Sequence, residues 1–216
     1  MRKVLLFSIL VATSMNAQVR EKNDIEISPF VGISLVDYYG DPSTKNNEAI
    51  TTPSYGVNAV FYFSDRLSIK TGMEYRIFGS SYNVEKRVAN PNILEPDYFI
   101  IVEAEDKIET INVPLQFSYH IGKSRKWNIM FGPTLTFVTK AKSDGVSIDE
   151  RLNKVQAGLQ LGASYKFYTT ENFNLAVELQ EYLGASNNLN STPYSKSPII
   201  ANLAGSVNLR ASFKIN

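Results

Sequence analysis

The chain has no cysteine and only one histidine. The lack of cysteine excludes disulfide bonds, thiolate metal sites and cysteine nucleophiles, as well as a lipid-modified cysteine at a mature N-terminus. A lone histidine cannot build a zinc site without cysteines or close carboxylate partners. Glycine-rich phosphate loops are also missing, because the glycines stand singly in the sequence. We therefore expect no metal and no cofactor.

Positive and negative charges nearly balance, because the chain has 22 lysines and arginines and 21 aspartates and glutamates. This balance offers no basic field for nucleic acid and no acidic tail, so we expect no nucleic-acid partner. No apolar run reaches the roughly 20 residues that a membrane-spanning helix needs, which excludes a helical membrane protein. The length of 216 residues suits one domain with a full core, or one small barrel.

The first residues have the composition of an export signal. Two positive residues stand near the start, residues 4–12 form a short apolar run, and small side chains follow as far as Ala17. The apolar run is too short to cross a bilayer. We predict a signal peptide over residues 1–17, cleaved after Ala17, and a single mature domain over residues 18–216.

The mature chain alternates apolar and polar residues with period 2 nearly throughout, which is the signal of β-strands. In residues 155–167 every odd position is apolar, and every even position is Gln, Gly, Ser or Lys. The same alternation recurs in seven further runs, at 25–35, 55–63, 67–77, 111–119, 127–137, 173–179 and 203–215. The total of eight is even, as closed antiparallel barrels of outer membranes require.

The connections between these runs alternate in length along the chain. The short ones are 64–66, 121–126 and 168–172, and the long ones are 36–54, 78–109, 139–154 and 184–199. Short and long connections therefore fall at opposite ends of the sheet, as in outer-membrane barrels. We expect loops 37–53, 79–108, 140–154 and 185–198 to face the outside. A short apolar run at 98–102 allows an extra hairpin, which makes ten strands the second choice.

Aromatic side chains are predicted to gather in two belts, which would suit two membrane–water interfaces. The belt at the short-turn end comprises Phe61, Phe63, Tyr119, Trp127, Phe167, Phe173 and Phe213. The belt at the long-loop end comprises Tyr38, Tyr39, Tyr55, Tyr75, Phe137 and Tyr182.

The polar face of the strands carries charged and amide side chains that would point into the barrel. They are Lys70, Glu74, Arg76, Gln116, Lys166, Glu178, Gln180 and Arg210. The lumen of an eight-stranded barrel is just wide enough for side chains to fill, and buried charges are costly unless they are paired. We predict a polar plug in which Glu74 and Glu178 pair with the arginines and lysines. A narrow ion path or a small polar ligand site is the alternative.

No set of residues with the pattern of a catalytic or metal site stands out. His120 falls at the short-turn end, where we expect a solvated turn residue rather than the base of an acyl-transfer site. Acidic residues cluster in the longest loop, at Asp97, Glu103, Glu105, Asp106 and Glu109. Their spacing matches no EF-hand, so we expect a solvated loop.

Several short motifs resemble the outer-membrane β-barrel domain family that includes PorT-like proteins. They are Asn16-Ala17-Gln18, Pro29-Phe30-Val31-Gly32, Ile111-Asn112-Val113-Pro114-Leu115-Gln116-Phe117 and Gly132-Pro133. The resemblance covers the whole mature chain, and its motifs specify architecture rather than chemistry. It implies an eight-stranded outer-membrane barrel, and some members of the family assist protein secretion or gliding machinery.

We therefore predict an all-β fold, an antiparallel up-and-down transmembrane β-barrel of eight strands in the cell outer membrane. The expected role is structural or interactive rather than enzymatic. Outer-membrane lipid would surround a monomer, and an envelope protein would bind through the loops. The alternatives are a soluble lipocalin-like barrel, with its apolar faces turned inward around a small apolar molecule, and an outer-membrane enzyme.

Overall fold

The computed structural model describes residues 20–40, 44, 46–88, 90, 98–189 and 200–215. The predicted signal peptide lies outside these residues. The described elements are β1 (Ile25–Gly40), β2 (Ile50–Tyr62), β3 (Leu67–Val88), β4 (Tyr98–Ile121), β5 (Trp127–Ser143), β6 (Val146–Ser147), the 3-10 turn η2 (Asp149–Arg151), β7 (Val155–Thr169), β8 (Phe173–Gly184) and β9 (Ile200–Lys214). Among the described residues, no helix is long and apolar enough to cross a membrane.

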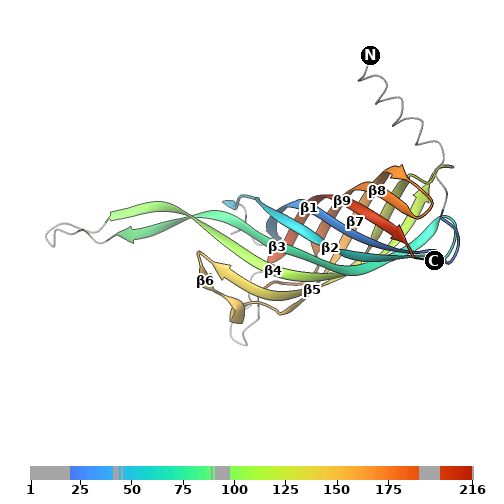
Figure 1. Ribbon diagram of the computed structural model, residues 1–216. Helices are drawn as coiled ribbons and strands as arrows, with labels where there is room; N and C mark the ends of the chain where they lie inside the picture. The colour runs from blue at the N-terminus through green and yellow to red at the C-terminus, as the bar shows by residue number, and fades with distance from the viewer. Residues whose placement is uncertain are drawn as a thin grey trace, which may run out of the picture.

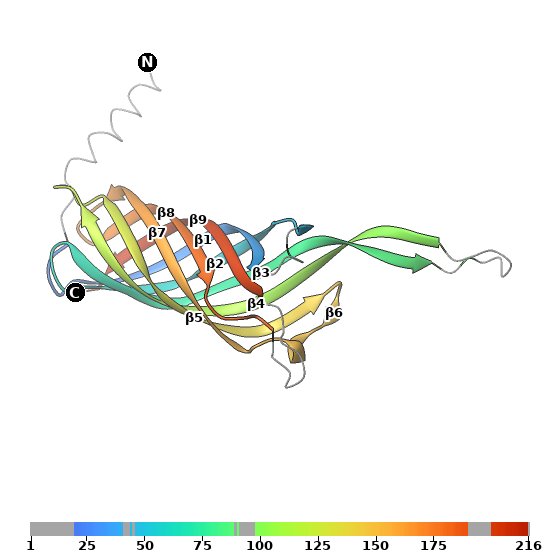
Figure 2. The same ribbon diagram turned by 180° about the vertical axis from the view of Figure 1, so that it is seen from behind.

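The long strands close into a ring in which every pairing is antiparallel (Figures 1 and 2). Strands that follow one another in sequence pair around the ring, and the pairing of β1 with β9 closes it. The two-residue strand β6 pairs only with β5 and stays outside the ring. Eight strands therefore form the barrel, as the alternation predicts. Closure gives each strand a hydrogen-bonded neighbour on both sides and leaves no open edge.

The prediction of a long loop at 79–108 is wrong, because β3 and β4 run for 22 and 24 residues. The pairing of Val88 with Tyr98 continues the pairing that begins at Leu67 and Tyr119. The apolar run at 98–102 thus belongs to β4, and the ten-strand count fails. The alternation fades there because both faces of the projecting hairpin meet solvent, as at Glu85 and Lys86. In the same way β1, β2 and β5 extend into parts of the predicted loops.

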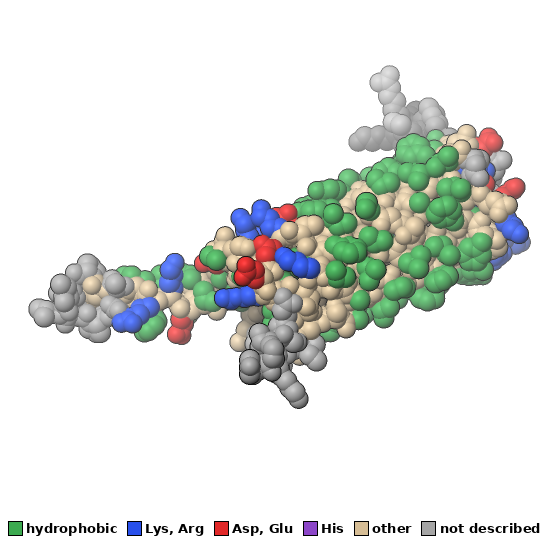
Figure 3. All heavy atoms as spheres, turned by 90° about the horizontal axis from the view of Figure 1, so that it is seen from below, with side chains coloured by type: hydrophobic (Ala, Val, Ile, Leu, Met, Phe, Trp, Pro, Cys, Tyr) green, Lys and Arg blue, Asp and Glu red, His purple; other side chains and the backbone are tan. Residues whose placement is uncertain are grey.

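The apolar stripes of the strands face outward and the polar stripes face inward. In β7, Leu161 is 47% exposed, whereas its neighbour Gln160 is 1% exposed. Hydrophobic side chains cover the barrel wall in Figure 3, and charged side chains gather at its two ends and along the hairpin. A soluble lipocalin-like barrel needs the opposite arrangement, so that alternative is wrong. The outward apolar surface suits the hydrocarbon interior of a membrane.

Both aromatic belts exist in part. At the short-turn end Phe61, Trp127 and Phe213 are exposed, and at the long-loop end Tyr39, Tyr55 and Phe137 are exposed. Tyr38 and Tyr182 are buried instead, which corrects their assignment to the outer belt. Both occupy even positions of strands whose even residues point inward.

Tyr38 and Tyr182 belong to an apolar cluster that fills the long-loop end of the lumen, and the sequence analysis missed this cluster. The other buried members are Val36, Phe78, Ile108, Val138, Ala141, Leu152 and Ala204. Gly158 makes room for the Tyr182 ring, because a Cβ at Gly158 would lie 2.5 Å from the ring carbon that bears the hydroxyl. The lumen therefore has an apolar outer layer above a polar interior.

Candidate functional site

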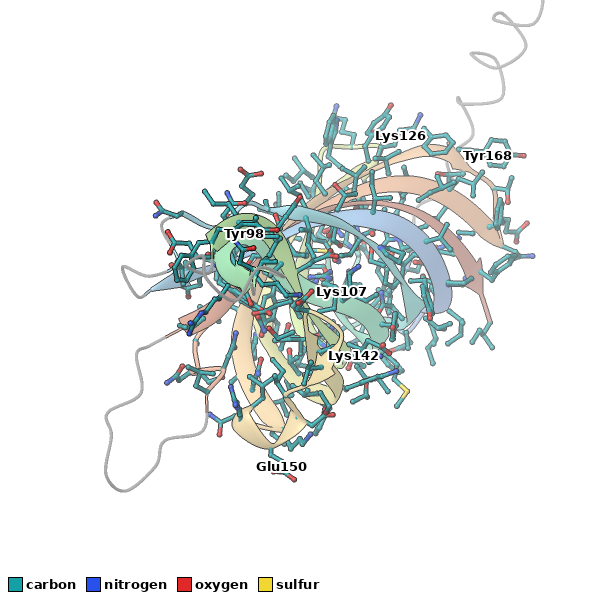
Figure 4. The ribbon with its side chains drawn as sticks, turned by 90° about the vertical axis from the view of Figure 1, so that its left-hand side faces the viewer. Tyr98, Lys107, Lys126, Lys142, Glu150 and Tyr168 are labelled. Carbon is teal, nitrogen blue, oxygen red and sulfur yellow. The ribbon has the colours of Figure 1, made fainter. Side chains whose placement is uncertain are left out.

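All eight charged and amide residues predicted to line the lumen are buried inside the barrel. They are Lys70, Glu74, Arg76, Gln116, Lys166, Glu178, Gln180 and Arg210. Seen from the hairpin end in Figure 4, side chains project both into the ring of strands and away from it. Alternation along each strand is the reason, because it sends every second side chain into the lumen.

Glu178 is the centre of the strongest ion cluster. Its Oε1 lies 2.7 Å from Lys70 Nζ, and its Oε2 lies 2.9 Å from Arg210 Nη1. Gln180 Nε2 also donates a hydrogen bond to Oε1. The cluster joins β3, β8 and β9, so it fastens three strands across the lumen rather than along one sheet.

Glu74 holds a second, looser group. Its Oε2 lies 3.8 Å from Arg76 Nη2 and accepts a hydrogen bond from Gln160 Nε2 at 3.3 Å. Asn58 Nδ2 donates to Oε1, also at 3.3 Å. Arg76 Nη2 also donates to Gln180 Oε1 at 3.5 Å, which links this group to the Glu178 cluster.

Two of the predicted residues stand apart from these groups. Both side-chain polar atoms of Gln116 lack a hydrogen-bond partner among the described residues. Lys166 lies nearer the short-turn end, where its Nζ donates to the Tyr62 hydroxyl at 3.2 Å. Alternation predicted that these side chains point inward, but it could not predict which of them meet.

The short-turn end of the lumen holds a third group that the sequence analysis missed. Arg20 Nε lies 2.6 Å from Glu26 Oε1, and the Tyr62 hydroxyl donates to Glu26 Oε2 at 3.2 Å. Asn174 Nδ2 also donates to Glu26 Oε1. Glu26 occupies an even position of the run at 25–35, so the period-2 alternation alone could have predicted that its side chain points into the lumen. Arg20 precedes the strand and carries no such signal.

His120 belongs to this end of the lumen and is 2% exposed, so the prediction of a solvated turn residue is wrong. Strand β4 continues to Ile121, and its even-numbered side chains, His120 among them, point into the lumen. His120 Nε2 lies 3.0 Å from Ser68 Oγ, but its Nδ1 has no partner among the described residues. A serine–histidine pair without an orienting acid is not the arrangement of an acyl-transfer site.

The predicted acidic cluster is divided between the two faces of the hairpin. Glu103, Glu105 and Glu109 line an outward hollow together with lysines of β4 and β5, and Lys107 Nζ lies 2.7 Å from Glu105 Oε2. Asp106 instead accepts a hydrogen bond from the Tyr82 hydroxyl at 3.0 Å. Asp97 lies outside the described residues. In the described part of the chain, no group of three or more histidine, aspartate or glutamate residues could hold a metal ion.

One carboxylate organises the turn between β6 and β7. Asp149 accepts hydrogen bonds from Ser147 Oγ at 2.7 Å and from the backbone N–H of Ala141 at 2.9 Å. These bonds, the one from Ser147 above all, lower the pKa of Asp149 below its ordinary value. The turn is therefore held in place by a charged group at neutral pH.

A closed antiparallel ring with apolar residues outside, polar residues inside and short turns at one end is an outer-membrane β-barrel. Residues 16–190 match the family model for the outer membrane protein β-barrel domain. The chain belongs to this family, and the protein resides in the outer membrane. In outer-membrane barrels the short turns face the periplasm and the longer connections face outward, and we expect the same orientation here. Membership of the PorT-like group stays a prediction.

Solved barrels with low sequence identity resemble the chain. They include the N-terminal β-barrel domain of Pseudomonas aeruginosa OprF, with 12% identity, TM-score 0.44 and coverage of 90% of this chain and 100% of that one. OprG of the same organism has 12% identity, TM-score 0.46 and coverage of 91% and 98%. Ail of Yersinia pestis, in complex with the heparin analogue sucrose octasulfate, has 13% identity, TM-score 0.44 and coverage of 90% and 99%. The search of curated proteins gives no match.

Proposed function

We propose that this barrel is a non-conducting interaction protein of the cell envelope, and that the projecting hairpin of β3 and β4 is its contact surface. The observation that carries the proposal is the length of that hairpin beyond the barrel wall (Figure 1). A tilted strand needs only about 9–11 residues to cross a bilayer. The paired segments from Phe78 and Ile108 to Val88 and Tyr98 add roughly 30 Å at about 3.3 Å per residue.

Exposed apolar side chains near the end of the hairpin support this role. Tyr98, Phe99, Ile100 and Ile101 are all exposed, with Phe99 at 65% and Ile101 at 73%. These side chains lie beyond the barrel wall, so membrane lipid does not cover them as it covers the apolar surface of the wall. Contiguous exposed apolar side chains commonly mark protein–protein contacts. The partner surface is therefore apolar, and the secretion machinery that the PorT-like resemblance implies for some members would be reached through this hairpin.

Site-specific photo-crosslinking in living cells tests the hairpin. A photoreactive residue at Phe99 should give one discrete protein adduct, and the substitution Ile101→Asp, on the same face of β4, should abolish that adduct. The control places the same photoreactive residue at Val146, which is exposed on β6. Val146→Asp should leave the Phe99 adduct unchanged. Equal adducts at both positions, or an Ile101→Asp variant that crosslinks as well as the parent, would contradict the proposal.

The polar plug supports the non-conducting part of the proposal, because charged and amide side chains fill the lumen under an apolar outer layer. In planar bilayers the purified protein should insert without producing conductance steps. Steps with an ion selectivity that changes in Arg76→Gln would show ions passing through the lumen and would contradict the proposal. Steps that are insensitive to Arg76→Gln would indicate leakage around the barrel.

A further inference from the structure

Buried positive charge exceeds buried negative charge at the periplasmic end of the lumen. Arg20 takes Glu26 as its ion-pair partner, and Arg210 shares Glu178 with Lys70. Lys166 is 5% exposed, and no carboxylate lies within ion-pair distance of it among the described residues. Within the described part of the chain, its Nζ donates to the Tyr62 hydroxyl and lies over the same ring, and that hydroxyl donates in turn to Glu26 Oε2. Arg20 and Lys166 therefore share the carboxylate of Glu26, and buried cations that exceed their counter-charges are costly.

Side-chain nitrogens without a hydrogen-bond partner line the cavity beside Lys166. Arg20 Nη2, Arg125 Nε and His120 Nδ1 have no partner among the described residues. The side chains of Arg20 and His120 are only 5% and 2% exposed, so bulk water does not readily replace the missing partner. These three residues and Lys166 line one small cavity, together with Tyr62, Asp65, Ser124 and Thr169. Asp65 turns its carboxylate outward, where it pairs with Arg125 at 3.2 Å.

We propose that this cavity binds a single monatomic anion of the chloride type. A water molecule could accept hydrogen bonds from the unpartnered nitrogens, but it would leave the excess of the cations Arg20 and Lys166 over Glu26 uncompensated. Lysine and arginine offer only donors, and such donors form their strongest hydrogen bonds to charged acceptors. The cavity volume of about 10 Å³ is at the lower limit of the space that one water molecule needs, so a single-atom anion would enter only with a small shift of the long Arg20 and Arg125 side chains. Phosphate, sulfate and lipid headgroups are too large for it.

The anion would join three separate parts of the chain at the periplasmic mouth. Arg20 lies on the segment before β1, Arg125 lies in the turn between β4 and β5, and Lys166 lies on β7. Arg125 Nη1 already donates to the backbone carbonyl of Arg20 at 3.0 Å. The bound ion would hold the segment around Arg20 against the barrel and close its periplasmic end.

Thermal unfolding of the purified barrel in detergent tests the proposal, with sodium chloride compared with sodium gluconate at equal ionic strength. Gluconate is too large for the cavity. Above the dissociation constant, each tenfold rise in chloride should raise the unfolding temperature by about 3–5 °C. Lys166→Gln should abolish the difference between the two salts. Lys123→Gln, which removes an exposed charge from the nearby turn, should preserve it and so controls for general salt effects.

Bromide-soaked crystals of the parent protein give a direct measurement that does not depend on the folding of a variant. The expected result is an anomalous peak within contact distance of Lys166 Nζ and Arg20 Nη2. Equal unfolding temperatures in the two salts, together with the lack of such a peak, would overturn the proposal. A salt difference that survives Lys166→Gln would also overturn it, because the effect would then arise elsewhere.

Discussion

Replacing Glu178 with glutamine is expected to lower the free energy of unfolding by about 3–5 kcal/mol. The substitution keeps the size of the side chain but removes the carboxylate that Lys70 and Arg210 share at 2.7 and 2.9 Å. Both cations would stay buried in the lumen without a counter-charge. Urea unfolding of the barrel in lipid vesicles measures the loss.

Glu181→Gln is the matched control, because it makes the same chemical change three residues further along β8. Glu181 is exposed on the outward face, between Leu161 and Gly205 on the neighbouring strands. Within the described residues the side chain of Glu181 makes no hydrogen bond or ion pair. Removing a charge from the lipid-facing wall should leave stability unchanged or raise it. Equal losses for the two variants would show that the two glutamates do not face opposite sides of the wall.

The second large effect is expected for Leu209→Arg, at about 2–4 kcal/mol for a cation in the middle of the lipid-facing surface. Leu209 is exposed, and its cross-strand neighbours Val31 and Val177 are exposed and apolar as well. An arginine at this position would find no counter-charge among those neighbours. The cost is again measured by unfolding in lipid vesicles.

Leu161→Arg provides a comparison that depends on the register of the sheet. Leu161 stands directly opposite Glu181 on β8, so a new arginine would meet a carboxylate on the same outward face. Its cost should be smaller than that of Leu209→Arg, and adding Glu181→Gln should increase it. If Leu161→Arg and Leu209→Arg are equally costly, and Glu181→Gln adds nothing, the register of β7 against β8 is wrong.

The strands could be predicted from the alternation wherever lipid lies on one side of the barrel wall and the lumen lies on the other. The cleanest predicted run, at 155–167, falls within β7 as the structure has it. The signal disappears where β3 and β4 leave the membrane, because both faces then meet water and no longer need different residues. Hence residues 79–88 were predicted to be loop although they are strand.

The contents of the lumen could be predicted only as a set of inward side chains. Lys70 and Glu178 are 108 positions apart in sequence, and ring closure brings them together. No local pattern carries that information, so the sequence could not predict that Lys166 meets Tyr62, or that the polar atoms of Gln116 lack a hydrogen-bond partner among the described residues. The inward parity of Tyr38, Tyr182 and His120 is present in the sequence, but the preference of tyrosine for interfacial belts and of histidine for turns indicates the opposite direction.

The protein is a closed barrel with an apolar outer wall in the outer membrane. Electrophoresis in SDS of protein from the outer-membrane fraction, boiled against unboiled, tests this structure most directly. A closed, detergent-stable barrel should migrate faster unboiled and lose that difference on boiling. Recovery of the protein in the soluble periplasmic fraction, with equal mobility in both samples, would contradict the account.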